Sequence, residues 1–186
     1  MSNDKEDLRV IRTKKSIRSA FEVMICEMDY EQITVKELAG RAGINRKTFY
    51  LHYESIGDLL RDLQNEMIDG FIERTKDLQR PKDMDKITRE FFLDHEETGK
   101  FAERITCSGS YHDFSRQITT SIMKHTWKAE DFDDQYVQEL VMVYVSQSTL
   151  ALYKKWITDR KPIAIEEMID IATALICRGA DGFIKI

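Results

Sequence analysis

The sequence predicts an all-α protein. Long stretches are rich in Leu, Ile, Lys, Glu and Gln, which favour helices, and the 186 residues include only two prolines and eight glycines. Alternation of apolar and polar residues with a period of two occurs only in short fragments such as residues 32–35, so we expect no sheet. We predict about nine helices, with an N-terminal three-helix helix-turn-helix domain over residues 1–54 and a larger helical domain over residues 55–186.

The first long helix is expected over residues 10–28. Its apolar residues recur at spacings of three and four and form one stripe: Ile17, Phe21, Met24, Ile25 and Met28. Residues 9–18 also hold five basic side chains and no acidic one: Arg9, Arg12, Lys14, Lys15 and Arg18. Alone, such a face is solvated; beside a DNA-binding motif it would contact phosphates.

Two shorter helices follow over residues 34–42 and 46–53. Thr34 and Glu37 have the spacing of a capping box, which marks the start of the first of them. Gly43 supplies the conformational freedom for a tight turn, and Asn45 can cap the next helix. Two helices joined by a short turn that contains glycine form the helix-turn-helix layout.

The second helix of this motif carries side chains suited to base edges and phosphates. They surround Phe49, which we expect to be buried: Arg46, Lys47, Thr48, Tyr50 and His52. The N-termini of both short helices also present backbone N–H groups that can bind phosphate.

We expect the remaining helices over residues 56–78, 84–97, 100–106, 111–127, 134–158 and 165–178. The last two carry wide apolar stripes, which either face the core of the protomer or pair with a second copy of the chain.

A ligand pocket is a further candidate in this larger domain. Apolar and aromatic residues alternate there with a few polar ones, which suits a pocket and equally an ordinary core: Phe91, Phe92, His95, Cys107, Tyr111, Phe114 and Trp127. No histidine of this region has a histidine partner at i+4 or a nearby cysteine, so we expect no metal site and no cofactor.

Composition excludes several classes of protein. The net charge of −5 argues at first against nucleic acid, but the first 53 residues hold 10 basic and 8 acidic side chains, so the excess of acidic charge lies in the rest of the chain. Three widely spaced cysteines indicate reduced thiols. No membrane segment or secretory signal is expected, which suits a cytoplasmic protein, and catalytic motifs such as G-x-S-x-G and H-E-x-x-H are missing, so we expect no enzyme.

The segments RTKKSIRSAF and ITVKELAGRAGINRKTFYLHYESIGDLL closely resemble the DNA-binding domain of the TetR family of transcriptional regulators. The resemblance covers residues 12–60. The segment INRKTFYLHY is similar to a subgroup common in low-GC Gram-positive bacteria, as is, less specifically, the later segment YVSQSTLALYKKWI.

The resemblance implies a bacterial homodimer, usually a repressor, that binds a palindromic operator in double-stranded DNA and responds to a small-molecule effector, here unknown, in its C-terminal ligand-binding and dimerisation domain. The DNA-binding residues that it implies are Thr34, Asn45, Arg46, Lys47, Thr48, Tyr50, His52 and Tyr53, with Arg12 and Lys14 on the first helix. The dimer interface that it implies contains Val137, Val141, Tyr144, Leu152, Trp156, Met168, Ala172 and Leu175.

The chain departs from the family pattern at two positions. Glu54 and Ile56 stand where relatives usually have basic residues that contact phosphate. An acidic side chain beside DNA would lower affinity. The alternative interpretation is therefore a helical dimeric protein-interaction module or co-regulator with weak or lost DNA binding.

Overall fold

The computed structural model describes residues 3–80, 82–127 and 132–179, and the side chains from residue 8 onward. Within these ranges the chain forms nine α-helices, two 3-10 helices and no strand, which confirms the all-α prediction. The elements in order are α1 (Asn3–Glu27), η1 (Tyr30–Gln32), α2 (Val35–Arg41), α3 (Arg46–Tyr50), α4 (Ile56–Thr75), α5 (Met84–Thr98), α6 (Lys100–Cys107), η2 (Gly109–Tyr111), α7 (His112–Thr126), α8 (Gln135–Thr158) and α9 (Ile165–Arg178).

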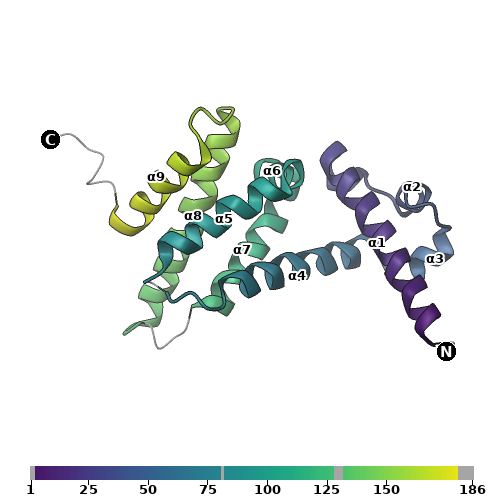
Figure 1. Ribbon diagram of the computed structural model, residues 1–186. Helices are drawn as coiled ribbons and strands as arrows, with labels where there is room; N and C mark the ends of the chain where they lie inside the picture. Colours follow the sequence, from purple (N-terminus) through teal and green to yellow (C-terminus); the bar gives the residue numbers. More distant parts are fainter. Residues whose placement is uncertain (1–2, 81, 128–131, 180–186) are drawn as a thin grey trace.

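The helices are arranged in two lobes that α4 connects (Figure 1). Helices α1, α2 and α3 form one end of the molecule, and α8 and α9 lie at the other end (Figure 1). Helices α5, α6 and α7 lie between them, and α6 contacts α1 while α5 contacts α9. The helix-turn-helix is therefore held at one end of the molecule, away from the C-terminal helix pair.

The core of the N-terminal lobe continues into the larger one. Ile17 and Phe21 of α1 and Phe49 of α3 are fully buried and share one apolar cluster with Leu59 of α4. Tyr111 of η2 and Phe114 and Ile118 of α7 belong to the same cluster. Burial of each large apolar side chain stabilises the fold by about 1.5–3 kcal/mol. The two lobes are thus joined by shared packing as well as by the chain.

Two further clusters fill the larger lobe. The second joins α4, α5, α8 and α9 and consists of Phe71, Met84, Ile87, Trp127, Val145 and Ile176. The third joins α5, α8 and α9 and consists of Phe92, Tyr153, Trp156, Met168, Ile169 and Ala172.

Helix starts and ends differ from prediction by more than one residue in three places. Helix α1 begins at Asn3, about two turns before the predicted residue 10. Helix α3 ends at Tyr50 instead of residue 53, because Leu51 and His52 continue as a turn in which His52 N–H donates to the Phe49 carbonyl at 2.9 Å. Helix α4 ends at Thr75 instead of residue 78.

The predicted capping box at the start of α2 is half formed. Thr34 Oγ1 accepts a hydrogen bond from Glu37 N at 3.3 Å, as predicted. The Glu37 carboxylate, however, accepts from Arg41 at 2.9 Å, and this ion pair takes the place of the return bond to Thr34 N.

Among the described helices, none is long and apolar enough to cross a membrane.

Candidate nucleic-acid interface

The turn between α2 and α3 is built around Gly43. Its φ of +68° lies in the left-handed region, which glycine adopts without strain. The turn closes with Ile44 N–H donating to the Ala39 carbonyl at 3.0 Å. Ser16 of α1 donates through Oγ to the Ala42 carbonyl at 2.8 Å and so ties the turn to the first helix. These bonds fix the angle at which α3 leaves α2.

Helix α3 presents its polar side chains to solvent. Phe49 is fully buried and anchors the helix, whereas Arg46, Lys47 and Tyr50 are exposed. Within the described chain, neither Arg46 nor Lys47 pairs with a carboxylate. Arginine and lysine contact guanine and phosphate, and an exposed tyrosine can contact the DNA backbone or a thymine methyl. The three side chains therefore form the centre of a candidate DNA-binding surface.

Asn45 and Thr34 act as helix caps at this surface. Asn45 Oδ1 accepts from Thr48 N at 2.8 Å and from Thr48 Oγ1 at 3.1 Å, while Asn45 itself stays exposed. The cap thus uses the carbonyl end of the Asn45 amide, and its NH₂ group is the part left to contact DNA.

Tyr53 lies in the core rather than on the exposed face with Tyr50. Its side chain is 3% exposed, and its hydroxyl donates to Asp62 Oδ2 at 2.9 Å. Burial, together with this hydrogen bond, raises the pKa of Tyr53 to about 12. Lys14 Nζ lies 5.4 Å from the centre of the Tyr53 ring, and His52 beside it is half-buried. Tyr53 therefore joins α3 to α4 and positions Lys14.

The arginines of α1 divide into two groups. Arg9 and Arg12 are exposed and line a groove of about 630 Å³ that reaches Ile44 in the helix-turn-helix. Arg18 instead turns to α4, where it pairs with Asp62 at 3.3 Å and with Glu66. The first group lies beside the helix-turn-helix and is a candidate for phosphate contacts, whereas Arg18 fixes α1 against α4.

The two unusual residues after α3 have different environments. Glu54 is exposed, and its backbone N–H donates to Asp58 Oδ2 at 3.1 Å. Ile56 is half-buried and packs against the first core cluster. Ile56 thus supports the start of α4, and Glu54 leaves an acidic charge near the basic surface.

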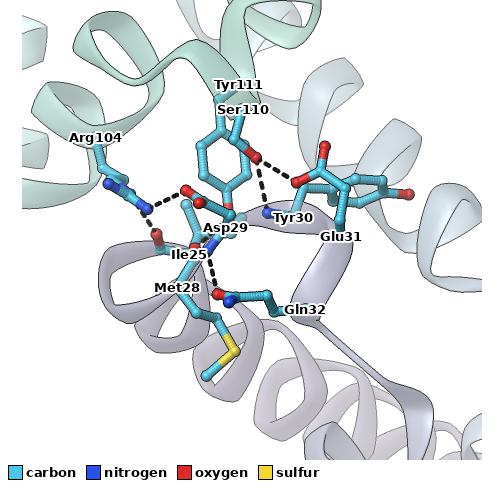
Figure 2. A network of polar contacts seen from close by, with 9 residues as sticks. All are labelled: Ile25, Met28, Asp29, Tyr30, Glu31, Gln32, Arg104, Ser110 and Tyr111. Carbon is cyan, nitrogen blue, oxygen red and sulfur yellow. Dashed lines mark hydrogen bonds and ion pairs between the residues drawn. The ribbon is translucent and has the colours of Figure 1, made fainter.

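A polar network joins the two lobes where α6 and η2 meet the end of α1 (Figure 2). Arg104 of α6 donates to Asp29 Oδ1 at 2.6 Å and to the Ile25 carbonyl at 3.3 Å. Tyr111 Oη donates to the Met28 carbonyl at 2.9 Å, so the network covers the end of α1.

Ser110 extends this network to η1. Its Oγ accepts from Tyr30 N at 2.9 Å and donates to Glu31 Oε2, also at 2.9 Å (Figure 2). We did not predict these contacts, because their partners lie about 80 positions apart and no short motif signals them.

A cavity lies between α4, α5, α6, α7 and α8. Its volume is about 80 Å³. Of the predicted pocket residues, Phe91, His95 and Trp127 line it. Phe92 lies in the third core cluster, Tyr111 and Phe114 lie in the first, and Cys107 is half-buried outside the lining. The prediction therefore found part of the cavity wall.

The rest of the wall is mostly apolar and comes from residues that sequence reasoning missed. Those with large apolar side chains are Met67, Phe71, Met84, Ile87, Ile105, Ile118, Ile122, Met123, Val145 and Leu150. Their regular helical spacing is the same as that of any core residue, so it did not distinguish a cavity wall from a filled core.

His95 is a polar group of the cavity wall. Its Nδ1 lies 2.9 Å from the Phe91 carbonyl, so Nδ1 must carry the proton that it donates. Burial lowers the pKa of His95 to about 4, which keeps the ring neutral at pH 7. No group of three His, Cys, Asp or Glu side chains that could hold a metal ion occurs in the described part of the chain.

The outer face of α8 is apolar and exposed. Its exposed large side chains are Tyr136, Val137, Leu140, Val143 and Tyr144. Of the predicted interface residues, Val137 and Tyr144 belong to this face, and Val141, Leu152 and Leu175 are half-buried. Trp156, Met168 and Ala172 are buried in the third cluster, where α8 and α9 pack against each other within one protomer.

Comparisons with known proteins agree with this architecture. Residues 17–63 match the family described as "Bacterial regulatory proteins, tetR family". The uncharacterized HTH-type transcriptional regulator YwcC of Bacillus subtilis (strain 168) is 26% identical over 194 aligned residues, which cover 100% of this chain and 80% of YwcC. The uncharacterized HTH-type transcriptional regulator YxbF of the same organism is 36% identical over 58 residues, or 31% of this chain and 15% of YxbF.

Solved structures show the same fold. A TetR transcriptional regulator from Streptococcus agalactiae 2603V has a TM-score of 0.67 at 18% identity, with 94% of this chain and 98% of that chain covered. NalD, the secondary repressor of the MexAB-OprM multidrug efflux pump in Pseudomonas aeruginosa, has a TM-score of 0.71 at 15% identity, with 92% of this chain and 96% of NalD covered.

A basic helix-turn-helix joined to a helical body defines the class of DNA-binding transcriptional regulators. The family match over residues 17–63 and the full-length relative support a TetR family transcriptional regulator, and the solved structures share its fold.

Proposed function

We propose that the protein is a homodimeric repressor that binds a palindromic operator and is released by a small-molecule effector. One observation carries the DNA-binding part: Arg46, Lys47 and Tyr50 are exposed around a helix-turn-helix whose turn is fixed by hydrogen bonds. A repressor acts by occupying a promoter, and NalD, which shares the fold, is described as a repressor. Such a protein works in the bacterial cytoplasm, and catalysis has no part in the proposal.

In this proposal residues 1–54 bind DNA and residues 55–186 dimerise and regulate. Arg46 or Lys47 reads a base edge, and a bidentate contact from arginine to guanine contributes about 1–3 kcal/mol of discrimination. Tyr50 contacts the backbone or a thymine methyl, and Thr34, Asn45, Thr48 and His52 hold neighbouring phosphates. Arg12 and Lys14 contact phosphate from α1, and Tyr53 acts through Lys14 and the packing of α3.

The exposed face of α8 supports the dimer. Val137, Leu140 and Tyr144 are each about half exposed, and their spacing of three and four places them on one side of the helix. A contiguous apolar surface of this kind marks an interaction site in most folded proteins. If a two-fold axis passes through this face, the same residues of both copies contact each other. The two α3 helices would then lie apart, so that each can enter one of two successive major grooves.

Helix α6 supports the regulatory part. It supplies Ala102 and Ile105 to the cavity wall, and the Arg104 between them holds the end of α1 through Asp29. An effector that shifts α6 would move this contact and with it the DNA-binding lobe. For such coupling the effector must bind the two arrangements with different affinity, typically by about 1–3 kcal/mol.

Selection from a library of random double-stranded DNA tests the proposal. We expect the full-length protein to enrich an inverted repeat whose half-site centres lie one helical turn, about 34–36 Å, apart or a multiple of it. Enrichment of no sequence over the starting library would contradict it.

A second function is favoured by Glu54. An exposed carboxylate beside the basic surface weakens phosphate contacts. If DNA binding is lost for this reason, the same dimer would act as a protein-interaction module or co-regulator through its C-terminal lobe. The selection experiment distinguishes the two, because only the repressor enriches a repeat.

A further inference from the structure

We propose that the effector is an amphipathic anion whose apolar body fills the cavity and whose acidic group binds Arg80. The inference rests on the proposed effector site and names its chemical class. Arg80 lies in the connection between α4 and α5, where it lines both the cavity and an open polar cleft beside it.

The charges of the cavity wall leave Arg80 unbalanced. Three titratable side chains line the cavity: Arg80, Asp94 and His95. Asp94 pairs with Arg74 at 2.5 Å, and His95 is neutral at pH 7. Arg80 has no ion pair or side-chain hydrogen bond with any described residue, although it is only partly exposed. The wall therefore presents one cation without a counterion.

Burial makes this guanidinium a site for an anion. Removing a charged group from water costs free energy unless an opposite charge or hydrogen bonds replace the water. Burial lowers the pKa of Arg80, and no carboxylate in the described chain offsets the effect. A ligand carboxylate can supply two parallel charge-assisted hydrogen bonds to a guanidinium.

Trp127 gives a second, independent observation. Its side chain lines the cavity, is 6% exposed, and its Nε1 has no hydrogen-bond partner among the described residues. The indole N–H can only donate, as can the Arg80 guanidinium. The cavity wall therefore holds two hydrogen-bond donors that have no acceptor among the described residues. A ligand with acceptor oxygens could bind both.

The position of Arg80 fits an amphipathic ligand. On one side lies the apolar cavity, and on the other lies a cleft of about 650 Å³ that also contains Lys76, Asp77 and His125. Lys76 pairs with Glu73 at 2.5 Å, so Arg80 remains the unpaired cation at the boundary. An acidic group at this boundary can bind Arg80 and stay partly hydrated while the apolar chain remains in the cavity.

The cavity also favours an elongated ligand. Arg80 lies just before α5, and His95 is near its end, so the wall from Met84 to His95 extends for about 16 Å along the helix. Between these ends the lining is mainly aliphatic and aromatic, which suits an unbranched chain.

Three probes with the same chain and different head groups test the class of ligand: dodecanoate, dodecanol and dodecyltrimethylammonium. Calorimetry on the full-length protein, below the micelle concentration and without DNA, should show that dodecanoate binds most tightly. Arg80→Gln should weaken dodecanoate binding by about tenfold to a hundredfold and leave dodecanol unchanged, since a charged hydrogen-bonding pair is lost only for the anion.

Two variants serve as controls. Arg80→Lys keeps the charge and should retain most of the affinity for dodecanoate. Lys82→Gln removes the same charge from an exposed residue outside the cavity and should have no effect. Circular dichroism melts verify that each variant folds.

Equal affinity for the three probes, or unchanged dodecanoate binding in folded Arg80→Gln, would overturn the proposal. Because this measurement contains no DNA, its result is separate from the test of operator binding. Failure of the DNA selection would refute the repressor and leave the assigned ligand class intact.

Discussion

Arg104 on α6 and Asp29 at the end of α1 form an ion pair of 2.6 Å between residues that are 75 positions apart. The same guanidinium donates to the Ile25 carbonyl, and its Cζ lies 5.8 Å from the centre of the Tyr111 ring. On the cavity side of α6, Ile105 lines the wall. One short helix thus contacts both the cavity and the N-terminal lobe.

Arg104→Ala should loosen the contact between the lobes. Both partners of the ion pair are partly exposed, so we expect a loss of only about 1 kcal/mol in the free energy of unfolding. Hydrogen exchange should become faster in residues 25–32, which lose their bonds to α6. The matched control is Arg116→Ala, which breaks an exposed pair with Asp113 within α7 and should leave exchange in residues 25–32 unchanged. Equal exchange in both variants would refute the linking role of Arg104.

Tyr53→Phe should affect stability, and Tyr50→Phe should not. Removing the Tyr53 hydroxyl deletes its bond to Asp62, which costs about 1 kcal/mol at pH 7. The folded-state pKa of about 12 lies above the usual value of 10, so folding favours the neutral phenol, and this stabilisation is present below pH 10 and lost as the pH rises to 12. Urea unfolding from pH 8 to 12 should therefore show a shallower alkaline decline for Tyr53→Phe than for Tyr50→Phe. Identical declines would contradict the assignment.

His95 should contribute to acid sensitivity. Its folded-state pKa of about 4 lies below the usual 6.5, so the neutral ring stabilises the fold above pH 6.5, and this contribution is lost as the pH falls to 4. The difference in pKa sets an upper limit of about 3 kcal/mol. His95→Asn should flatten the pH dependence of urea unfolding in this window, whereas His125→Asn, at an exposed position, should not. An NMR titration that gives His95 a pKa near 6.5 would exclude this effect.

Leu140→Glu should dissociate the dimer. It places a charge in the middle of the exposed α8 face, where a truncated or charged central contact typically costs about 2–4 kcal/mol of association free energy. Sedimentation at micromolar concentration should give twice the protomer mass of 21.8 kDa for the parent and the protomer mass for the variant. Lys154→Glu, exposed on the same helix but outside this face, should remain dimeric. A parent that sediments at 21.8 kDa would contradict the proposed interface.

The helix-turn-helix could be predicted from sequence because its signals are local. Thr34, Gly43 and Asn45 mark the caps and the turn within a dozen residues, and each has the predicted conformation or hydrogen bond. Phe49 is fully buried as expected. Tyr53 differs from the prediction for a tertiary reason: its hydroxyl faces Asp62 of α4, which no motif around residue 53 signals.

The cavity was harder to predict because its wall is assembled from five helices. Phe91, His95 and Trp127 were found by composition, but Phe92 and Tyr111 have the same character and lie in filled cores. Helical periodicity identifies the buried side of each helix. It does not show where the packing between helices leaves a cavity. Arg80, in a connection between helices, had no sequence signal.

Binding of the protein to its own promoter region tests the central claim most directly. We expect fluorescence anisotropy to show saturable binding that weakens steeply as salt rises, because several phosphate contacts release counterions. Arg46→Ala should reduce specific affinity by about 1–3 kcal/mol, whereas Arg61→Ala, exposed on α4 and paired with Asp58, should not. Absent or salt-insensitive binding would contradict the account, and so would Arg46→Ala and Lys47→Ala variants that both bind as tightly as the parent.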